Sequence, residues 1–176
     1  MDITKKIKDM PRLFVAINLN DEMKDSLMDI QDTMREYGMY GRETVPENMH
    51  LTLAFIGDFD DVELVKEAVE SIEIRPFRIK LSGIGAYGDL WWAGLENSPP
   101  LLAVSRRLRR ALADAGVPFD RKKFSPHITL IRRATGSVRD IPAGELEQYF
   151  GASMTVDHIS LMRSDRGKHG MIYTEL

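Results

Sequence analysis

Two short segments of the chain share one pattern, a histidine and a threonine two positions apart within an apolar run. They are His50–Leu53 (HLTL) and His127–Leu130 (HITL). Residues i and i+2 of a β-strand face the same side, so each segment would present an imidazole and a hydroxyl on one face. Two histidines held across one cleft could act as a general acid and a general base near neutral pH.

A metal site is the main alternative use for two histidines. Zinc sites in proteins take three or four protein ligands, and a carboxylate or thiolate normally completes the set. Neither segment carries Asp or Glu on its histidine face, although the fold could bring in Asp58. The chain has no cysteine and no Gly-x-Ser-x-Gly motif, which argues against thiolate ligands and against a serine nucleophile. We therefore expect a site without a metal or a cofactor.

Positive charge is concentrated near the second segment. The whole chain has a formal net charge of −3, which argues against a general polyanion binder. Residues 106–133, however, contain only two acidic residues and nine basic ones: Arg106, Arg107, Arg109, Arg110, Arg121, Lys122, Lys123, Arg132 and Arg133. This segment is either a solvated helix face with a charged loop or a field that attracts a ligand carrying phosphate.

The charges close to His127 suggest different roles for the two histidines. Lysines 122–123 precede His127 and arginines 132–133 follow it, whereas His50 lies in a neutral, apolar segment. Nearby positive charge favours a neutral, basic imidazole, so His127 is the more natural base and His50 the more natural acid. Strict alternation places Arg133 on the face of His127 and Arg132 on the opposite face. A bulge or the end of the strand could turn either arginine inward.

The pattern of apolar residues predicts a mixture of strands and helices. Strands are expected at 12–19, 49–56, 77–81, 90–95, 125–132, 154–162 and 171–176. Helical spacing predicts helices at 21–36, at 60–72 and from 99 to about 115, with a further short helix at 144–150. Asn20, Asp60 and the Pro99–Pro100 pair are the expected helix starts.

The two histidine segments stand 77 positions apart, and each follows a strand–helix unit of similar size. This spacing suggests an internal duplication, with two pseudo-symmetric lobes on either side of a central cleft. The chain has no linker or low-complexity tract, so residues 1–176 are expected to form a single α+β domain with two lobes.

Composition places limits on where the chain works. It is 43% hydrophobic and 29% charged, which is ordinary for a globular protein. There is no apolar run long enough to span a membrane, and Met1–Met10 is polar without an apolar signal core. We therefore expect a cytoplasmic protein, a monomer, with no membrane partner.

The flanks of the two segments resemble a known family. Val45–Gly57 (VPENMHLTLAFIG) and Phe124–Arg132 (FSPHITLIR) are similar to the two signature motifs of the 2H phosphoesterases, most closely the RNA 2′,3′-cyclic phosphodiesterase branch once called 2′–5′ RNA ligases. Three further segments, Arg12–Ile17, Leu90–Leu95 and Ser164–Tyr173, also resemble parts of that family, so the likeness covers nearly the whole chain. It implies two lobes whose antiparallel sheets line the cleft, with helices on the outside.

The resemblance also implies a reaction and roles for particular residues. The expected activity is metal-independent hydrolysis of RNA 2′,3′-cyclic phosphate ends to 2′-phosphate ends. His50 would donate a proton to the departing 3′ oxygen, and His127 would accept one from water. Thr52, Thr129 and Arg132 would bind the phosphoryl oxygens.

Three other functions remain open on the sequence alone. The same residues could join RNA ends through a 2′–5′ bond, which is the reverse chemistry. They could act on a small cyclic nucleotide, such as ADP-ribose cyclic phosphate. A protein that binds RNA without catalysis would keep the cleft but would not need both histidines and both threonines.

A few further side chains could contribute to such a site or to its framework. Phe14 and Phe124 could stack on a base, as aromatic residues do in single-stranded RNA sites, or could pack in the core. Tyr173 could line the cleft or close a sheet edge. His158 has no threonine two positions on and is expected to be structural, whereas His169 lies in a basic loop that could touch RNA.

Overall fold

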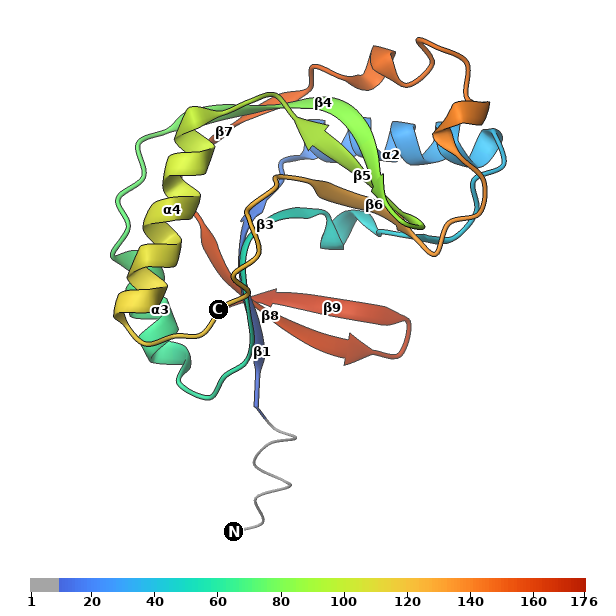
Figure 1. Cartoon of the computed structure of the whole chain (residues 1–176). Helices are drawn as coiled ribbons and strands as arrows, with labels where there is room; N and C mark the ends of the chain where they lie inside the picture. The colour runs from blue at the N-terminus through green and yellow to red at the C-terminus, as the bar shows by residue number, and fades with distance from the viewer. Residues whose placement is uncertain (1–9) are drawn as a thin grey trace.

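Two antiparallel sheets make up the framework of the computed structural model, which describes residues 10–176 (Figure 1). The first sheet has the order β3 (His50–Asp58), β1 (Arg12–Asn18), β8 (Ser160–Gly167), β9 (Gly170–Glu175). The second has the order β2 (Arg42–Glu43), β6 (Ile128–Arg132), β5 (Leu90–Leu95), β4 (Phe77–Tyr87), β7 (Ser153–Val156). The predicted α+β architecture with antiparallel sheets is confirmed.

The described part of the chain has three α-helices, and each is preceded by a residue whose side chain caps it. They are α2 (Asp21–Glu36), α3 (Val62–Glu70) and α4 (Pro99–Asp114). The side chains of Asn20, Asp61 and Ser98 accept hydrogen bonds from backbone N–H groups of the first turns. The cap of α3 is thus Asp61 and not Asp60 as predicted, and that helix ends at Glu70, two residues before the predicted end.

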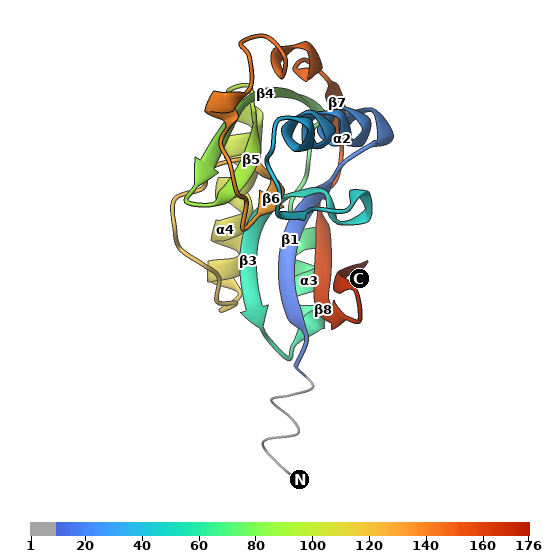
Figure 2. The ribbon, with the colours of Figure 1, turned by 90° about the vertical axis from the view of Figure 1, so that its right-hand side faces the viewer.

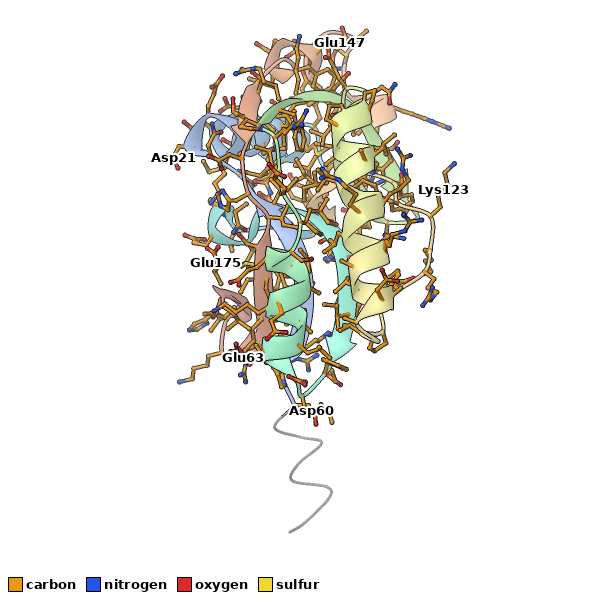
Figure 3. The ribbon with its side chains drawn as sticks, turned by 90° about the vertical axis from the view of Figure 1, so that its left-hand side faces the viewer. Asp21, Asp60, Glu63, Lys123, Glu147 and Glu175 are labelled. Carbon is orange, nitrogen blue, oxygen red and sulfur yellow. The ribbon has the colours of Figure 1, made fainter. Side chains whose placement is uncertain are left out.

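The helices lie on the outer faces of the sheets. The helix α2 follows β1 of the first sheet but contacts β6 and β7 of the second, whereas α3 contacts β8 and α4 contacts β3. Figure 2 shows β3, β1 and β8 side by side with α3 and α4 behind them, and Figure 3 shows these two helices from the other side. Helix α2 therefore connects the two sheets, and all three helices contribute to one continuous core.

The two sheets do not correspond to the two halves of the sequence. Strands β8 and β9 from the end of the chain extend the sheet of β1, and β2 from the first half pairs with β6 from the second. The expected strand at 154–162 is wrong, because residues 157–159 separate β7 in one sheet from β8 in the other. The expected helix at 144–150 is a short 3₁₀ turn, Glu147–Tyr149, one of three such turns within residues 10–176 with Pro46–Asn48 and Val138–Asp140.

Strand β1 separates the core from the cleft. Leu13, Val15 and Ile17 face the main core, whereas Phe14 and Ala16 belong to a smaller apolar cluster on the other face. Alternation along one strand thus supplies both a part of the core and the apolar floor beneath His50.

No helix among residues 10–176 is both long and apolar enough to cross a membrane. The expectation for the amino terminus falls on residues 1–9, which lie outside the described part of the chain.

Candidate active site

An open cleft of about 950 Å³ lies between the two sheets, and both predicted histidine–threonine pairs line it. His50 and Thr52 come from β3 of the first sheet, and Thr129 comes from β6 of the second. His127 directly precedes β6, one residue outside the strand in which it was expected. The fold therefore brings together two segments that are 77 positions apart in the chain.

His50 is held by hydrogen bonds at both ring nitrogens. Nδ1 lies 2.7 Å from the carbonyl oxygen of Asn48 and Nε2 lies 2.9 Å from Oγ1 of Thr52. A carbonyl oxygen only accepts, so Nδ1 carries a hydrogen and Nε2 of the neutral ring accepts from the threonine hydroxyl. The rings of Phe14 and Tyr173, with centroids 5.0 and 5.2 Å from the imidazole, fix the ring on its other sides.

His127 is held in a closely similar way. Its Nδ1 lies 2.8 Å from the carbonyl oxygen of Ser125, again the residue two positions before the histidine. This contact places the hydrogen of the neutral ring on Nδ1 and leaves Nε2 as an acceptor. Tyr87 approaches the imidazole edge-on with ring centroids 5.4 Å apart, and Trp92 lies 6.1 Å away. Both histidines thus have the same tautomer and an aromatic support.

The pKa of His50 is lowered from its usual value near 6.5. Burial of the imidazole is the largest cause, and the positive charges of Arg132 and His127 lower it further, against the raising effect of the hydrogen bond to Asn48. The neutral ring is therefore favoured in the free protein. The sequence-based expectation that His50 has neutral surroundings is wrong, because the charge of Arg132 lowers its pKa.

This pKa shift makes a prediction about stability. The unfolded chain binds the proton of residue 50 more readily than the folded protein does, so the free energy of unfolding should fall as the pH drops below about 6.5. In His50→Asn this contribution is absent, and the loss of stability between about pH 7 and pH 5 should be smaller than in the wild type. Urea unfolding at several pH values measures the difference. His169→Asn, at an exposed site, is the matched control, and equal pH dependence in wild type and His50→Asn would contradict the shift.

Each histidine–threonine pair is followed by a β-bulge at the same position. Thr52 and Ala54 pair with adjacent residues of β1, so Leu53 is the extra residue of β3. Thr129 and Ile131 pair with adjacent residues of β5, so Leu130 is the extra residue of β6. In both strands the residue five positions after the histidine, Phe55 or Arg132, therefore faces the cleft.

The second bulge decides which arginine faces the site. Trp91 and Trp92 point to opposite sides of β5, so their partners Ile131 and Thr129 do the same. Arg132 therefore shares the face of Thr129, contrary to strict alternation. Arg133 follows with a positive φ of 52° and also lines the cleft.

Five arginines and one carboxylate line the cleft. The arginines are Arg12, Arg42, Arg132, Arg133 and Arg166. The carboxylate is that of Glu43, whose two oxygens accept hydrogen bonds of 2.9 and 2.6 Å from Arg35. A ligand in the cleft therefore meets a positive field, which suits a phosphate group.

The comparisons with known proteins agree with this geometry. Residues 23–168 match the family model described as the 2′-5′ RNA ligase superfamily. The chain belongs to this superfamily. A protein of Methanothermobacter thermautotrophicus named RNA 2′,3′-cyclic phosphodiesterase is 31% identical, and the match covers 94% of this chain and 96% of that one. The crystal structure of E. coli LigT superposes with a TM-score of 0.79 at 27% identity, covering 96% of each chain. LigT has also been solved with 3′-AMP, with a TM-score of 0.76 and 26% identity to this chain.

Most of the basic segment singled out by the sequence lies away from the cleft of this superfamily member. Of its nine residues only Arg132 and Arg133 line the cleft. The arginines of α4 are on the outer layer, where Arg107 and Arg109 donate to the carbonyl oxygens of Glu73 and Lys122. Figure 3 shows Lys123 at the outer edge of the molecule beyond α4.

The two phenylalanines proposed for base stacking have different positions. Phe14 lines the cleft but is 4% exposed, since it lies beneath His50 and Tyr173. Phe124 is not among the residues that line the cleft and packs against the core, with its ring 5.9 Å from the Arg109 guanidinium carbon.

Of the four remaining candidate side chains, two line the cleft and two do not. Tyr173 and His169 line the cleft. His158 is exposed, and its Nδ1 lies 2.6 Å from Oδ1 of Asp157. Asp58 is exposed at the end of β3. Neither His158 nor Asp58 lines the cleft.

Sequence reasoning missed two of the five cleft arginines, Arg12 and Arg42, whereas Arg166 belongs to the basic loop that was expected to be able to touch RNA. Arg12 lies on β1 on the same face as Phe14, and its guanidinium carbon is 5.0 Å from the ring centre of Phe55. Because Arg12 and Phe14 are two positions apart in a predicted strand, the sequence indicates that both side chains face the same side. Arg42 comes from the two-residue strand β2, and no local pattern indicates that it faces the histidines.

Proposed function

We propose that the protein hydrolyses the 2′,3′-cyclic phosphate at RNA ends to a 2′-phosphate, without a metal ion. The observation that carries this proposal is the pair of imidazoles with the same tautomer on opposite walls of one arginine-lined cleft. The name of the M. thermautotrophicus relative supports the substrate class. Acid–base catalysis by two histidines is suited to this reaction, because one proton must leave water as another reaches the departing oxygen.

In the proposed reaction, Nε2 of His127 takes a proton from water as the water oxygen bonds to phosphorus. The bond from phosphorus to the 3′ oxygen breaks, and Nε2 of His50 gives that oxygen a proton. The products are a 3′ hydroxyl and a 2′-phosphate. Thr52, Thr129 and Arg132 bind the phosphoryl oxygens, where negative charge must be held in the transition state.

The lowered pKa of His50 bears on its role as the acid. The free protein favours the neutral ring, whereas a proton donor must be charged. A bound phosphate anion next to Nε2 stabilises the imidazolium and raises this pKa. In this proposal His50 therefore gains its proton together with the substrate.

Product analysis tests the proposal directly. A short RNA ending in a 2′,3′-cyclic phosphate is incubated with the protein in EDTA, and the ends are identified by ³¹P NMR and mass spectrometry. We expect a 2′-phosphate at an unchanged rate relative to a sample without EDTA. A 3′-phosphate product would overturn the proposed regiochemistry. Loss of activity in EDTA would overturn the proposed metal independence.

Two added substrates separate the related activities. An RNA with a 5′ hydroxyl end tests for joining through a 2′–5′ bond, in which that hydroxyl takes the place of water as the nucleophile. ADP-ribose cyclic phosphate tests for action on small nucleotides. Faster turnover of either one than of the RNA end would replace the proposed substrate class.

A further inference from the structure

Two arginines face each other across the outermost strand pair of the cleft. Arg42 on β2 is directly opposite Arg132 on β6, and both are exposed and line the cleft. Opposite residues of an antiparallel pair point to the same side, with Cβ atoms about 5 Å apart. Guanidinium groups do not lose their charge in proteins, and like charges in this position destabilise a sheet.

Carboxylates of the described residues do not neutralise this arginine pair. Within residues 10–176, the ion pairs formed by arginine are Arg35 with Asp32 and Glu43, and Arg163 with Asp165. Glu43 is the neighbour of Arg42 in β2, but both of its oxygens are engaged by Arg35. The two positive charges therefore remain available to a ligand.

The position of β2 is fixed by buried contacts. Nε2 of Gln31, a residue only 5% exposed, donates to the carbonyl oxygens of Thr44 and Leu130 at 2.9 Å each. Gly41 allows the backbone to approach, because a Cβ there would lie 2.6 Å from the carbonyl oxygen of Arg132. The juxtaposition of Arg42 and Arg132 is thus a built feature of the wall.

The two arginines differ in their distance from the catalytic pair. The charge of Arg132, a cleft arginine on β6, lowers the pKa of His50, so this arginine acts on the catalytic pair. Arg42 lies on the edge strand, one strand further out than β6. A ligand with one phosphate at the histidines and a second anion towards β2 would meet both arginines.

We propose that Arg42 binds the phosphodiester that precedes the cyclic phosphate in an RNA chain. The cleft then has a second anion subsite, and it prefers an RNA end to a free cyclic nucleotide, which lacks that phosphodiester. The inference rests on the proposed function, because it assumes that the cyclic phosphate occupies the site between the histidines. Arginine binds phosphate oxygens with two parallel hydrogen bonds, which gives this contact direction as well as charge.

Three substrates test the subsite by turnover. They are adenosine 2′,3′-cyclic phosphate, a dinucleotide with a 2′,3′-cyclic phosphate end, and the same dinucleotide with an uncharged methylphosphonate between its nucleosides. In Arg42→Gln we expect kcat/KM for the charged dinucleotide to fall at least about tenfold, since a hydrogen bond to a charged group is lost. The values for the other two substrates should stay within about twofold. Arg110→Gln on α4, which removes the same charge outside the cleft, should leave all three unchanged.

A binding measurement makes the result independent of turnover. In a His127→Ala background, the affinity for the charged dinucleotide is measured at several salt concentrations. Removing one phosphate contact should reduce the slope of log K against log salt by about 0.7 when Arg42→Gln is added. Thermal unfolding should show an equal or higher midpoint for Arg42→Gln, because a like-charge contact is relieved. A purely structural role for Arg42 would instead lower the midpoint.

The outcomes separate the subsite from the reaction. Equal loss on all three substrates would place Arg42 at the reacting phosphate and overturn the proposal, as would no loss on any of them with an unchanged salt slope. Failure of wild-type protein to hydrolyse any of the substrates would overturn the proposed function. In that case the salt slope alone would support or overturn the subsite.

Discussion

Replacing either histidine of the cleft by alanine should reduce kcat for cyclic phosphate hydrolysis by roughly 10³-fold, the scale on which a positioned acid or base acts. His50 and His127 line the cleft from different sheets, and each is fixed by a hydrogen bond from Nδ1 to a backbone carbonyl oxygen, so neither can take the position of the other. The measurement is single-turnover hydrolysis of an RNA with a 2′,3′-cyclic phosphate end.

Matched controls separate chemistry from folding. His158→Ala, at an exposed site outside the cleft, should keep full activity. Both cleft variants should retain a cooperative thermal transition. Activity within about tenfold of wild type in either cleft variant would contradict a two-histidine mechanism.

A modified substrate assigns the acid and the base. When sulfur replaces the bridging 3′ oxygen, the departing thiolate needs no proton in the transition state. His50→Ala should then recover much of its lost rate, whereas His127→Ala should not, because water still has to be activated. The opposite pattern would exchange the two roles.

Arg132→Gln should lower kcat/KM by about 10²-fold or more, the effect of losing one donor to a developing phosphoryl charge. The bulge at Leu130 turns this side chain to the cleft face, beside Thr129 and within range of His50. Arg132→Lys keeps the charge but loses the planar fork of the guanidinium, so its activity should lie between those of the wild type and Arg132→Gln.

A second measurement on Arg132→Gln does not depend on turnover. Because the charge of Arg132 lowers the pKa of His50, its removal should raise that pKa, which an NMR titration of the imidazole can follow. Arg133→Gln is the informative neighbour, since Arg133 also lines the cleft. A larger loss of activity in Arg133→Gln than in Arg132→Gln would transfer the phosphate contact to Arg133.

The local elements could be predicted from the sequence because they depend on near neighbours. The apolar spacing of Met23, Leu27 and Ile30 places the buried face of α2, and Asn20 caps it as expected. The strand at Leu90–Leu95 has the predicted bounds. Periodicity was less useful at 144–162, where short segments change direction and the chain passes from one sheet to the other.

The membership of the sheets could not be predicted in the same way. The pairing of β1 with β8 joins residues about 150 positions apart, and no local pattern encodes that contact. The sequence suggested that each half of the chain forms one lobe. Because long-range pairing is not visible in local patterns, it could not show that each sheet contains strands from both halves.

The sequence by itself determined that two imidazole–hydroxyl pairs exist and that each sits in an apolar segment, because residue type and spacing are local properties. Tertiary structure alone decided which charges surround them. Arg12, Arg42 and Arg166 come from three different strands, and a bulge set by pairing with β5 turns Arg132 inward. The low pKa of His50 likewise arises from burial and from charges contributed by the opposite wall. Electrostatic interactions act through space, so the field around these histidines appears only when the distant segments are packed together.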